Sequence, residues 1–302
     1  MSAPSIPNLL SLRGNGARTY ARTRGIDRLV DSFLSGHGSS DGARQIISLG
    51  AGTDTRPFRL FHSRHPAGKL IYHEIDFPGP SARKLRTVEA TPQLGSVLPH
   101  RTGGDAGHWS SRPTPGSEYH SHGVDIRSLH ASSSSSSFAE PTTAANETLP
   151  GLRTDLPTLV LSECCLCYLL PEEAERVVAY FSSRIPHLSI VIYEPVHLGD
   201  AFGDTMVANL AARRIFMPTL ERFRTRGDQE ARLRAAGFET VRHMTIDGVW
   251  DSWVGQDERE RLDRLEGLDE VEEWKLLAGH YLVVWGSTKA ATAAGGAHLG
   301  VR

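Results

Sequence analysis

A glycine-rich turn follows the first apolar strand expected in this chain and leaves room for a ligand against the backbone. The sequence IISLGAGTDTRPFRL, residues 46–60, passes from an apolar run into Gly50 and Gly52 and then into the expected start of a helix. Glycines let a ligand approach the backbone closely because no Cβ intervenes. In open α/β sheets, ligands bind beyond the carboxyl ends of the strands. The turn therefore predicts a site for a small ligand.

Asp76 ends the next expected strand, KLIYHEID at 69–76, and suits a ribose-binding role. Dinucleotide-binding folds place such an acid about 20 residues after the glycines, where its carboxylate accepts hydrogen bonds from ribose hydroxyls. Residue 55, however, is Thr, where G-x-G-x-x-G has its third Gly beside a pyrophosphate. The pattern favours a nucleoside ligand without a pyrophosphate, and S-adenosylmethionine fits. An ordinary strand-to-helix turn remains the alternative.

Two further acidic positions follow expected strands. Asp125, in GVDIRSL, would lie at the end of a third strand and accept a hydrogen bond from an adenine amine, with Ile126 packed on the ring. Glu163 ends the apolar strand at 157–163. Each acid alone fits an ordinary loop. Together with Gly50 and Asp76, they predict one rim at the carboxyl edge of a sheet.

Strands and helices alternate along the chain, and several strands are continuous apolar runs, which indicates a mostly parallel sheet covered on both faces. The late strands at 238–246 and 280–287, joined by a charged helix, allow a parallel sheet with a late paired edge. The other expected strands are 45–49, 69–76, 157–163 and 189–196, and the expected helices include 18–34, 171–185 and 202–215.

The chain is expected to form a single domain over residues 17–289. Residues 1–16 and the tail 290–302 are predicted to be disordered from their small and polar composition. A low-complexity insertion is predicted near 91–150, around one short element at 123–129.

Composition limits the class of protein. The 302 residues carry a net charge of −2, which offers no whole-protein argument for nucleic acid or an acidic membrane surface. No stretch is apolar enough for a transmembrane helix, and the N-terminus makes a poor signal peptide. The chain has three cysteines, Cys164, Cys165 and Cys167, which are too close in sequence to form a disulfide framework. We expect a monomer in the cytoplasm, with a nuclear location also compatible.

The cysteine cluster is a weak metal signal. C-C-x-C lacks a distant partner pair, and neighbouring strand residues point to opposite faces, so buried thiols are the expected state and no metal is predicted. Tyr193 and Glu194 end the fifth expected strand, where Tyr193 suits either the pocket or the core.

Five segments together resemble leucine carboxyl methyltransferases. The resemblance runs with gaps from about residue 18 to residue 289 and implies a class I methyltransferase fold, a Rossmann-like, seven-stranded, mostly parallel sheet with helices on both faces. It implies S-adenosylmethionine-dependent methylation of the C-terminal leucine α-carboxylate of type-2A protein phosphatase catalytic subunits. The segments are SLGAGTDTRPFRL, YHEIDFP, LSECCLCYLLPEEAERV, IVIYEPVHLGDAFGDTMVANLAARR and LDEVEEWKLLAGHYLVVW.

The resemblance also implies roles for particular residues. Arg22 matches an arginine near both the cofactor carboxylate and the substrate carboxylate, and Tyr168 matches an active-site tyrosine. The implied cofactor-binding residues are Arg22, Gly50, Gly52, Asp76, Asp125, Ile126 and Glu163. The family carries, before its arginine, a helical segment with a lysine that covers the cofactor, whereas no lysine precedes Arg22 here. We therefore expect the cofactor cover to differ.

Three alternatives stay open. One is a related methyltransferase that acts on a small carboxylic acid or a modified tRNA base. Another is an inactive remnant without the cofactor cover. A nicotinamide dehydrogenase is disfavoured by Thr55 and by the lack of an obvious catalytic His or Tyr-Lys arrangement.

Overall fold

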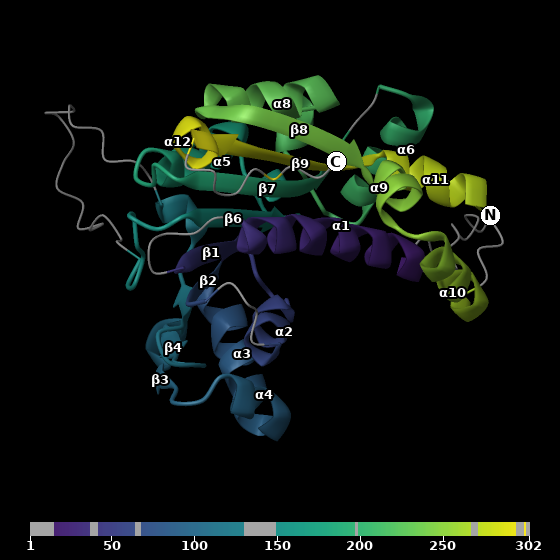
Figure 1. Cartoon of the computed structure of the whole chain (residues 1–302). Helices are drawn as coiled ribbons and strands as arrows, with labels where there is room; N and C mark the ends of the chain where they lie inside the picture. The colour runs from purple at the N-terminus through teal and green to yellow at the C-terminus, as the bar shows by residue number, and fades with distance from the viewer. Residues whose placement is uncertain are drawn as a thin grey trace, which may run out of the picture.

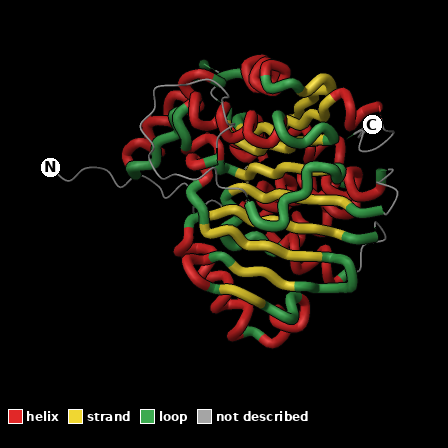
Figure 2. The backbone as a smooth tube through the Cα atoms, turned by 90° about the vertical axis from the view of Figure 1, so that its left-hand side faces the viewer, coloured by secondary structure: helices red, strands yellow, loops and turns green. Residues whose placement is uncertain are grey.

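The computed structural model describes residues 15–36, 42–63, 68–129, 149–196, 199–266, 271–293 and 299. Its centre is one sheet with the strand order β3-β4-β5-β2-β1-β6-β7-β9-β8 (Figure 2). The strands are β1 (Arg44–Leu49), β2 (Leu70–Asp76), β3 (Thr102–Gly103), β4 (Trp109–Ser111), β5 (Glu118–Gly123), β6 (Thr158–Glu163), β7 (Leu188–Pro195), β8 (Phe238–Thr245) and β9 (Tyr281–Thr288).

The expected seven-stranded sheet is present as β5-β2-β1-β6-β7-β9-β8. Strands β5, β2, β1, β6 and β7 run parallel, and β9 is antiparallel to both β7 and β8. The late paired edge allowed by the sequence is present, and the structure shows that its strands are antiparallel. Every residue of β1 and β7 is buried, which explains their continuous apolar runs. The short strands β3 and β4 extend the sheet beyond β5 as an antiparallel pair.

Helices cover both faces of the sheet (Figure 1). The first face carries α1 (Asn15–Ser35), α2 (Arg56–His62), α3 (Pro78–Ala90), α4 (Pro92–Val97), α9 (Ile246–Trp253), α10 (Gln256–Glu266) and α11 (Val271–Gly279). The second face carries α5 (Pro171–Ser182) and α8 (Arg226–Ala235). The remaining helices are α6 (Ala201–Ala212), α7 (Thr219–Arg222) and α12 (Lys289–Ala293), with short 3-10 turns η1 (Asp105–Gly107), η2 (Ile126–Ser128) and η3 (Leu166–Tyr168).

Local chemistry explains where several helices begin. Helix α5 starts at Pro171. Proline is well suited to this first position, because a backbone N–H there would have no partner within the helix. The Leu170 backbone N–H donates to the Glu173 carboxylate. Helix α8 has a reciprocal cap in which the Thr225 hydroxyl accepts from the Asp228 backbone N–H and Asp228 accepts from the Thr225 backbone N–H. The predicted start of α5 is thus confirmed.

The prediction of a single short element between residues 91 and 150 is wrong. Helix α4 and strands β3, β4 and β5 all lie within 91–129, and residues 130–148 fall outside the described part. The sequence hid β5 because its residues, EYHSHG, are polar, whereas its burial comes from contacts with β2 and β4. The predicted element at 123–129 is the end of β5 followed by η2, so Asp125 lies just beyond a strand as expected.

The chain ends are more structured than expected where they are described. Residues 15 and 16 belong to α1, and residues 290–293 belong to α12. Leu299 is 3% exposed, and its carbonyl accepts a hydrogen bond from the Trp285 indole N–H. Residues 1–14, 294–298 and 300–302, where disorder is predicted, lie outside the described part. Among the described helices, none combines the length and apolar character needed to cross a bilayer.

Candidate active site

A cavity of about 360 Å³ lies at the carboxyl ends of β1 and β6. From β1 the chain continues to β2 on one side, and β6 later adds on the other side, so the strand order reverses here. Ligands bind at such reversal points in open α/β sheets. Four of the predicted site residues line the cavity: Arg22, Gly50, Gly52 and Glu163.

The turn after β1 requires glycine at its first position. Gly50 has φ +61° and Gly52 has φ +50°, in the left-handed region that side chains disfavour. The Gly50 backbone N–H donates to the Ile75 carbonyl at 2.8 Å, which ties the turn to β2. A Cβ at Gly50 would also lie 2.7 Å from Cys165 Sγ. The turn is therefore kept small by its backbone angle and by a neighbouring thiol.

Asp76 braces this turn from the end of β2. Its Oδ2 accepts the Gly52 backbone N–H at 2.7 Å, and its Oδ1 accepts the Phe77 backbone N–H at 2.7 Å. Asp76 itself is outside the cavity lining. Each carboxylate oxygen keeps a further lone pair, so Asp76 can still accept a hydrogen bond from a ligand hydroxyl.

Arg22 and Glu163 form an ion pair in the lining of the cavity. Arg22 Nε lies 3.0 Å from Glu163 Oε1 as an ion pair, although the Nε–H does not make a hydrogen bond of good geometry. Both side chains are about one-third exposed, at 33% and 29%. The Arg22 guanidinium also lies 5.7 Å from the centre of the Tyr193 ring. Arg22 from α1 thus reaches the carboxyl ends of the central strands.

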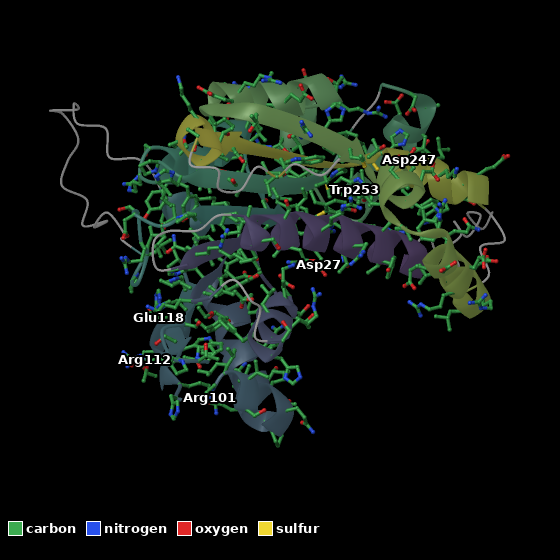
Figure 3. The ribbon with its side chains drawn as sticks, in the orientation of Figure 1. Asp27, Arg101, Arg112, Glu118, Asp247 and Trp253 are labelled. Carbon is green, nitrogen blue, oxygen red and sulfur yellow. The ribbon has the colours of Figure 1, made fainter. Side chains whose placement is uncertain are left out.

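Arg56 is a cavity residue that the sequence analysis missed. Its Nη2 lies 3.5 Å from Glu163 Oε2, its Nε lies 3.0 Å from Asp27 Oδ1, and its Nη1 lies 2.5 Å from Asp54 Oδ2. Asp27 extends from α1 toward α2 (Figure 3). Burial opposes the Arg56 charge, but the surrounding Tyr72 and carboxylates raise its pKa above the usual value.

A signal for Arg56 was available in the sequence. The residue stands at the first position of a helix, where a cation is unfavourable next to the positive end of the helix dipole. Such a cation needs carboxylate partners, and Asp54 precedes it by two residues. What the sequence could not supply is Asp27, which comes from α1.

Asp125 and Ile126 lie beyond the carboxyl end of β5, at the same sheet edge, but not in the cavity lining. Asp125 accepts three side-chain hydrogen bonds from Arg127, at 2.5–3.0 Å, and this pairing lowers the pKa of its carboxyl. Ile126 is 8% exposed and packs in the apolar cluster of the second face. Asp125 would have to leave Arg127 to contact a ligand.

Tyr168 lies in η3, close to the site but outside the cavity lining. Its side chain is 48% exposed, and partial burial together with Cys167 and Cys164 raises its pKa to about 12. Tyr281 also acts on Tyr168 and stacks on Tyr193 with 5.5 Å between ring centres. The Tyr168 hydroxyl is therefore protonated at neutral pH, and Arg22 lies over the Tyr193 ring of the stacked tyrosine pair.

The three cysteines follow the end of β6 and lie outside the cavity lining. Burial raises the pKa of Cys165 to about 12, and the Cys164 thiol and burial raise the pKa of Cys167. Among the residues that the structure describes, no group of three His, Cys, Asp or Glu side chains is arranged to hold a metal ion. Neutral thiols are poor metal ligands and poor nucleophiles.

The residues present fit S-adenosylmethionine. The turn at the end of β1 has no room for a Cβ at Gly50, and the Asp76 carboxylate accepts a hydrogen bond from the turn. Arg22 and Glu163 form an ion pair in the same cavity. A guanidinium suits the carboxylate of an amino acid, and a carboxylate suits an ammonium group. The fold and this site define a Rossmann-like α/β protein of the class I methyltransferase type, with a nucleoside site at the strand reversal.

Comparisons with known proteins identify the family. A family model described as leucine carboxyl methyltransferase matches residues 7–182. The leucine carboxyl methyltransferase 1 of Aspergillus fumigatus is 46% identical over 293 residues, covering 90% of this chain and 72% of that protein. That of Yarrowia lipolytica is 38% identical over 271 residues, covering 89% and 77%. The chain belongs to the leucine carboxyl methyltransferase family, which confirms the predicted enzyme class.

A second kind of relative carries a different name. The tRNA wybutosine-synthesizing protein 4 of Rattus norvegicus is 33% identical over 270 residues, covering 88% of this chain but 37% of that protein. Among solved structures, an O-methyltransferase family protein from Burkholderia thailandensis has a TM-score of 0.46 at 15% identity. The match covers 93% of this chain and 60% of the Burkholderia thailandensis chain.

Proposed function

We propose that this protein uses S-adenosylmethionine to methylate the α-carboxylate of a C-terminal leucine on a type-2A protein phosphatase catalytic subunit. The observation that carries the proposal is the meeting of Arg22, Glu163 and the Gly50 turn in one cavity at the strand reversal. Family membership supports the reaction, because the relatives are named for methylation of a leucine carboxyl group.

The cofactor would be held by the carboxyl edge of the sheet. Asp76 would accept a hydrogen bond from a ribose hydroxyl, and Glu163 would face the ammonium group of the amino-acid part. The cofactor supplies a methyl group that is already activated by the sulfonium charge. A carboxylate nucleophile is already deprotonated at neutral pH, so the protein needs no general base.

Arg22 would hold carboxylate groups at the reacting centre. A guanidinium binds a carboxylate bidentately and stays charged, which orients the nucleophilic oxygen. Arg22 pairs with Glu163, so a ligand carboxylate must compete with Glu163 for it. Arg56, 3.5 Å from the other Glu163 oxygen, can keep that carboxylate neutralised during the exchange.

Tyr168 would contribute a second contact to the substrate carboxylate. Its raised pKa keeps the hydroxyl protonated, so it can donate one hydrogen bond to the substrate carboxylate without adding charge. A second cation in that position would bind the carboxylate more tightly and make it a weaker nucleophile. Positioning of this kind accounts for about 7–11 kcal/mol at most.

The test is transfer of a labelled methyl group from S-adenosylmethionine to a phosphatase catalytic subunit, compared with the same subunit lacking its terminal leucine. We expect label only on the intact subunit. Equal labelling of both subunits, or label on tRNA alone, would contradict the proposal and favour the second relative's kind of substrate.

Arg22→Ala tests the role of the guanidinium. We expect kcat to fall about 100-fold or more, because lost alignment of the carboxylate has costs of that order. Arg24→Ala is the matched control, since Arg24 lies on the same helix and is exposed outside the cavity. Wild-type turnover by Arg22→Ala would refute the assignment.

A further inference from the structure

A closed ring of ion pairs joins α1 to the carboxyl end of β6 and to the start of α2. Arg22 Nε and Arg56 Nη2 lie 3.0 Å and 3.5 Å from the two oxygens of Glu163. Arg56 Nε lies 3.0 Å from Asp27 Oδ1, and Asp27 stands on α1, as Arg22 does. The ring therefore contacts α1 twice, and one of the contacts is Arg22 itself.

Asp27 also binds a second guanidinium of α2. Arg59 Nη1 lies 2.6 Å from Asp27 Oδ2, and Arg59 Nη2 lies 3.2 Å from Asp27 Oδ1. The Asp27 side chain is 16% exposed, and that of Arg56 is 5% exposed. Both oxygens of Asp27 thus accept from α2, so this carboxylate fixes α1 against α2 (Figure 3).

Arg56 fixes the turn after β1 as well. Its Nη1 lies 2.5 Å from Asp54 Oδ2, and its backbone N–H donates to Asp54 Oδ1 at 2.9 Å. Asp54 lines the cavity together with Gly50 and Gly52 of the same turn. One guanidinium therefore contacts residues of α1, of the glycine turn and of the end of β6.

Stability alone does not call for a cation at this position. Arg56 is 4% exposed and stands at the first position of α2, next to the positive end of the helix dipole. Buried ion pairs add little net stability, because desolvation offsets their attraction. An apolar side chain would avoid both costs. What the charged ring supplies is a fixed geometry around Glu163.

We propose that Asp27 and Arg56 are positioning residues for Arg22 and Glu163. Asp27 locks the helix that carries Arg22 to α2, and Arg56 holds one oxygen of Glu163. A ligand carboxylate that displaces Glu163 from Arg22 then meets a guanidinium whose helix is already in place. The inference rests on the proposed function, in which Arg22 holds the reacting carboxylate.

Asp27→Asn opens the ring with little change of shape. The amide has the size of the carboxylate but lacks the charge that pairs with Arg56 and Arg59. Arg56 keeps Asp54 and Glu163, so we expect the variant to fold, which circular dichroism checks. We expect kcat for methyl transfer to the phosphatase catalytic subunit to fall about tenfold, because small misplacements at a reacting centre have costs of that order or more.

The decisive measurement repeats Asp27→Asn in an Arg22→Ala background. If Asp27 acts through Arg22, no guanidinium is left to misplace, so kcat should change there by less than about twofold. A purely structural role of Asp27 would lower kcat by the same factor in both backgrounds.

Magnetic resonance of the Arg22 side chain gives a readout that needs no activity. The Arg22 Nε atom is buried, so its N–H should exchange slowly with water in the wild type. We expect about tenfold faster exchange in Asp27→Asn. The Arg22 signal is identified by its loss in Arg22→Ala.

Two further variants separate geometry from charge. Arg56→Lys keeps a cation but replaces the planar fork by one ammonium group, which cannot span three carboxylates, so kcat should fall as in Asp27→Asn. Asp251→Asn is the matched control, because it removes an exposed ion pair with Lys275 between two other helices, α9 and α11. It should change neither kcat nor the exchange of the Arg22 N–H.

The outcomes keep this inference distinct from the proposed function. Wild-type kcat in Asp27→Asn or Arg56→Lys would overturn the positioning role. The same loss of kcat in both backgrounds would overturn it too, because Asp27 would then act independently of Arg22. If the wild-type protein transfers no methyl group to the phosphatase, the proposed function fails, while the exchange of the Arg22 N–H still decides whether Asp27 holds Arg22.

Discussion

Stability should fall steeply in mild acid because of histidines buried between β2 and β5. His73 Nδ1 lies 2.9 Å from His122 Nε2, and His73 Nε2 lies 3.2 Å from Gln45 Oε1. His120 stacks on His73 with 4.9 Å between ring centres. Burial, together with the neighbouring imidazoles, lowers the pKa of His73 well below its usual value and that of His122 to about 3. Both rings therefore stay neutral in the folded protein.

The sign and size follow from proton linkage. In the unfolded chain each imidazole titrates near pH 6.5, so below that pH the unfolded state binds more protons and the free energy of unfolding falls. At pH 5 each of His73 and His122 costs about 2 kcal/mol, or about 4 kcal/mol together. The loss continues down to the folded-state pKa of His122, about 3. Above about pH 7.5 both imidazoles are neutral in the folded and the unfolded state, so they no longer contribute to the pH dependence of stability.

The assay is urea unfolding at pH 7.5 and pH 5 for the wild type and for His73→Leu with His122→Leu. Other groups that face the pair, including His120, His108 and Glu118, remain in both proteins and cancel in the difference. Between pH 7.5 and pH 5, we expect the free energy of unfolding of the wild type to fall by about 4 kcal/mol more than that of the variant. A change below about 1 kcal/mol would refute the reasoning.

Two further predictions concern the glycine turn and a buried lysine. Gly50→Ala should weaken S-adenosylmethionine binding and lower the melting temperature more than Gly199→Ala does, by calorimetry and thermal melts. Both have positive φ, but open space surrounds a Cβ at Gly199, and a thiol lies 2.7 Å away at Gly50. Lys84→Met should cost about 3–5 kcal/mol in urea unfolding because it leaves Glu74, 2.6 Å away and 2% exposed, buried without its cation. Lys275→Met, at an exposed pair, should cost under about 1 kcal/mol; equal losses would contradict this account.

The sequence predicted those strands whose buried residues are mostly apolar. Strands β1, β6 and β7 are almost wholly buried, so their apolar runs identified them within a residue or two. Strand β5 was missed because its residues are polar, and their burial comes from β2 and β4, including the stacking of His120 and His122 with His73 of β2. The single charged helix expected before the last strand is resolved as α10 and α11, preceded by α9.

By itself the sequence determined which residues stand at the carboxyl ends of strands, because strand ends follow from local composition. These strand ends predict that Gly50, Asp76 and Glu163 lie at the carboxyl edge of the sheet, where the structure has them. The tertiary structure alone decided which side chains meet there. Arg22 pairs with Glu163, far away in the chain, and Asp125 turns to Arg127 instead of the cavity. The Arg22–Glu163 pairing depends on how α1 packs on the sheet, which no local pattern encodes.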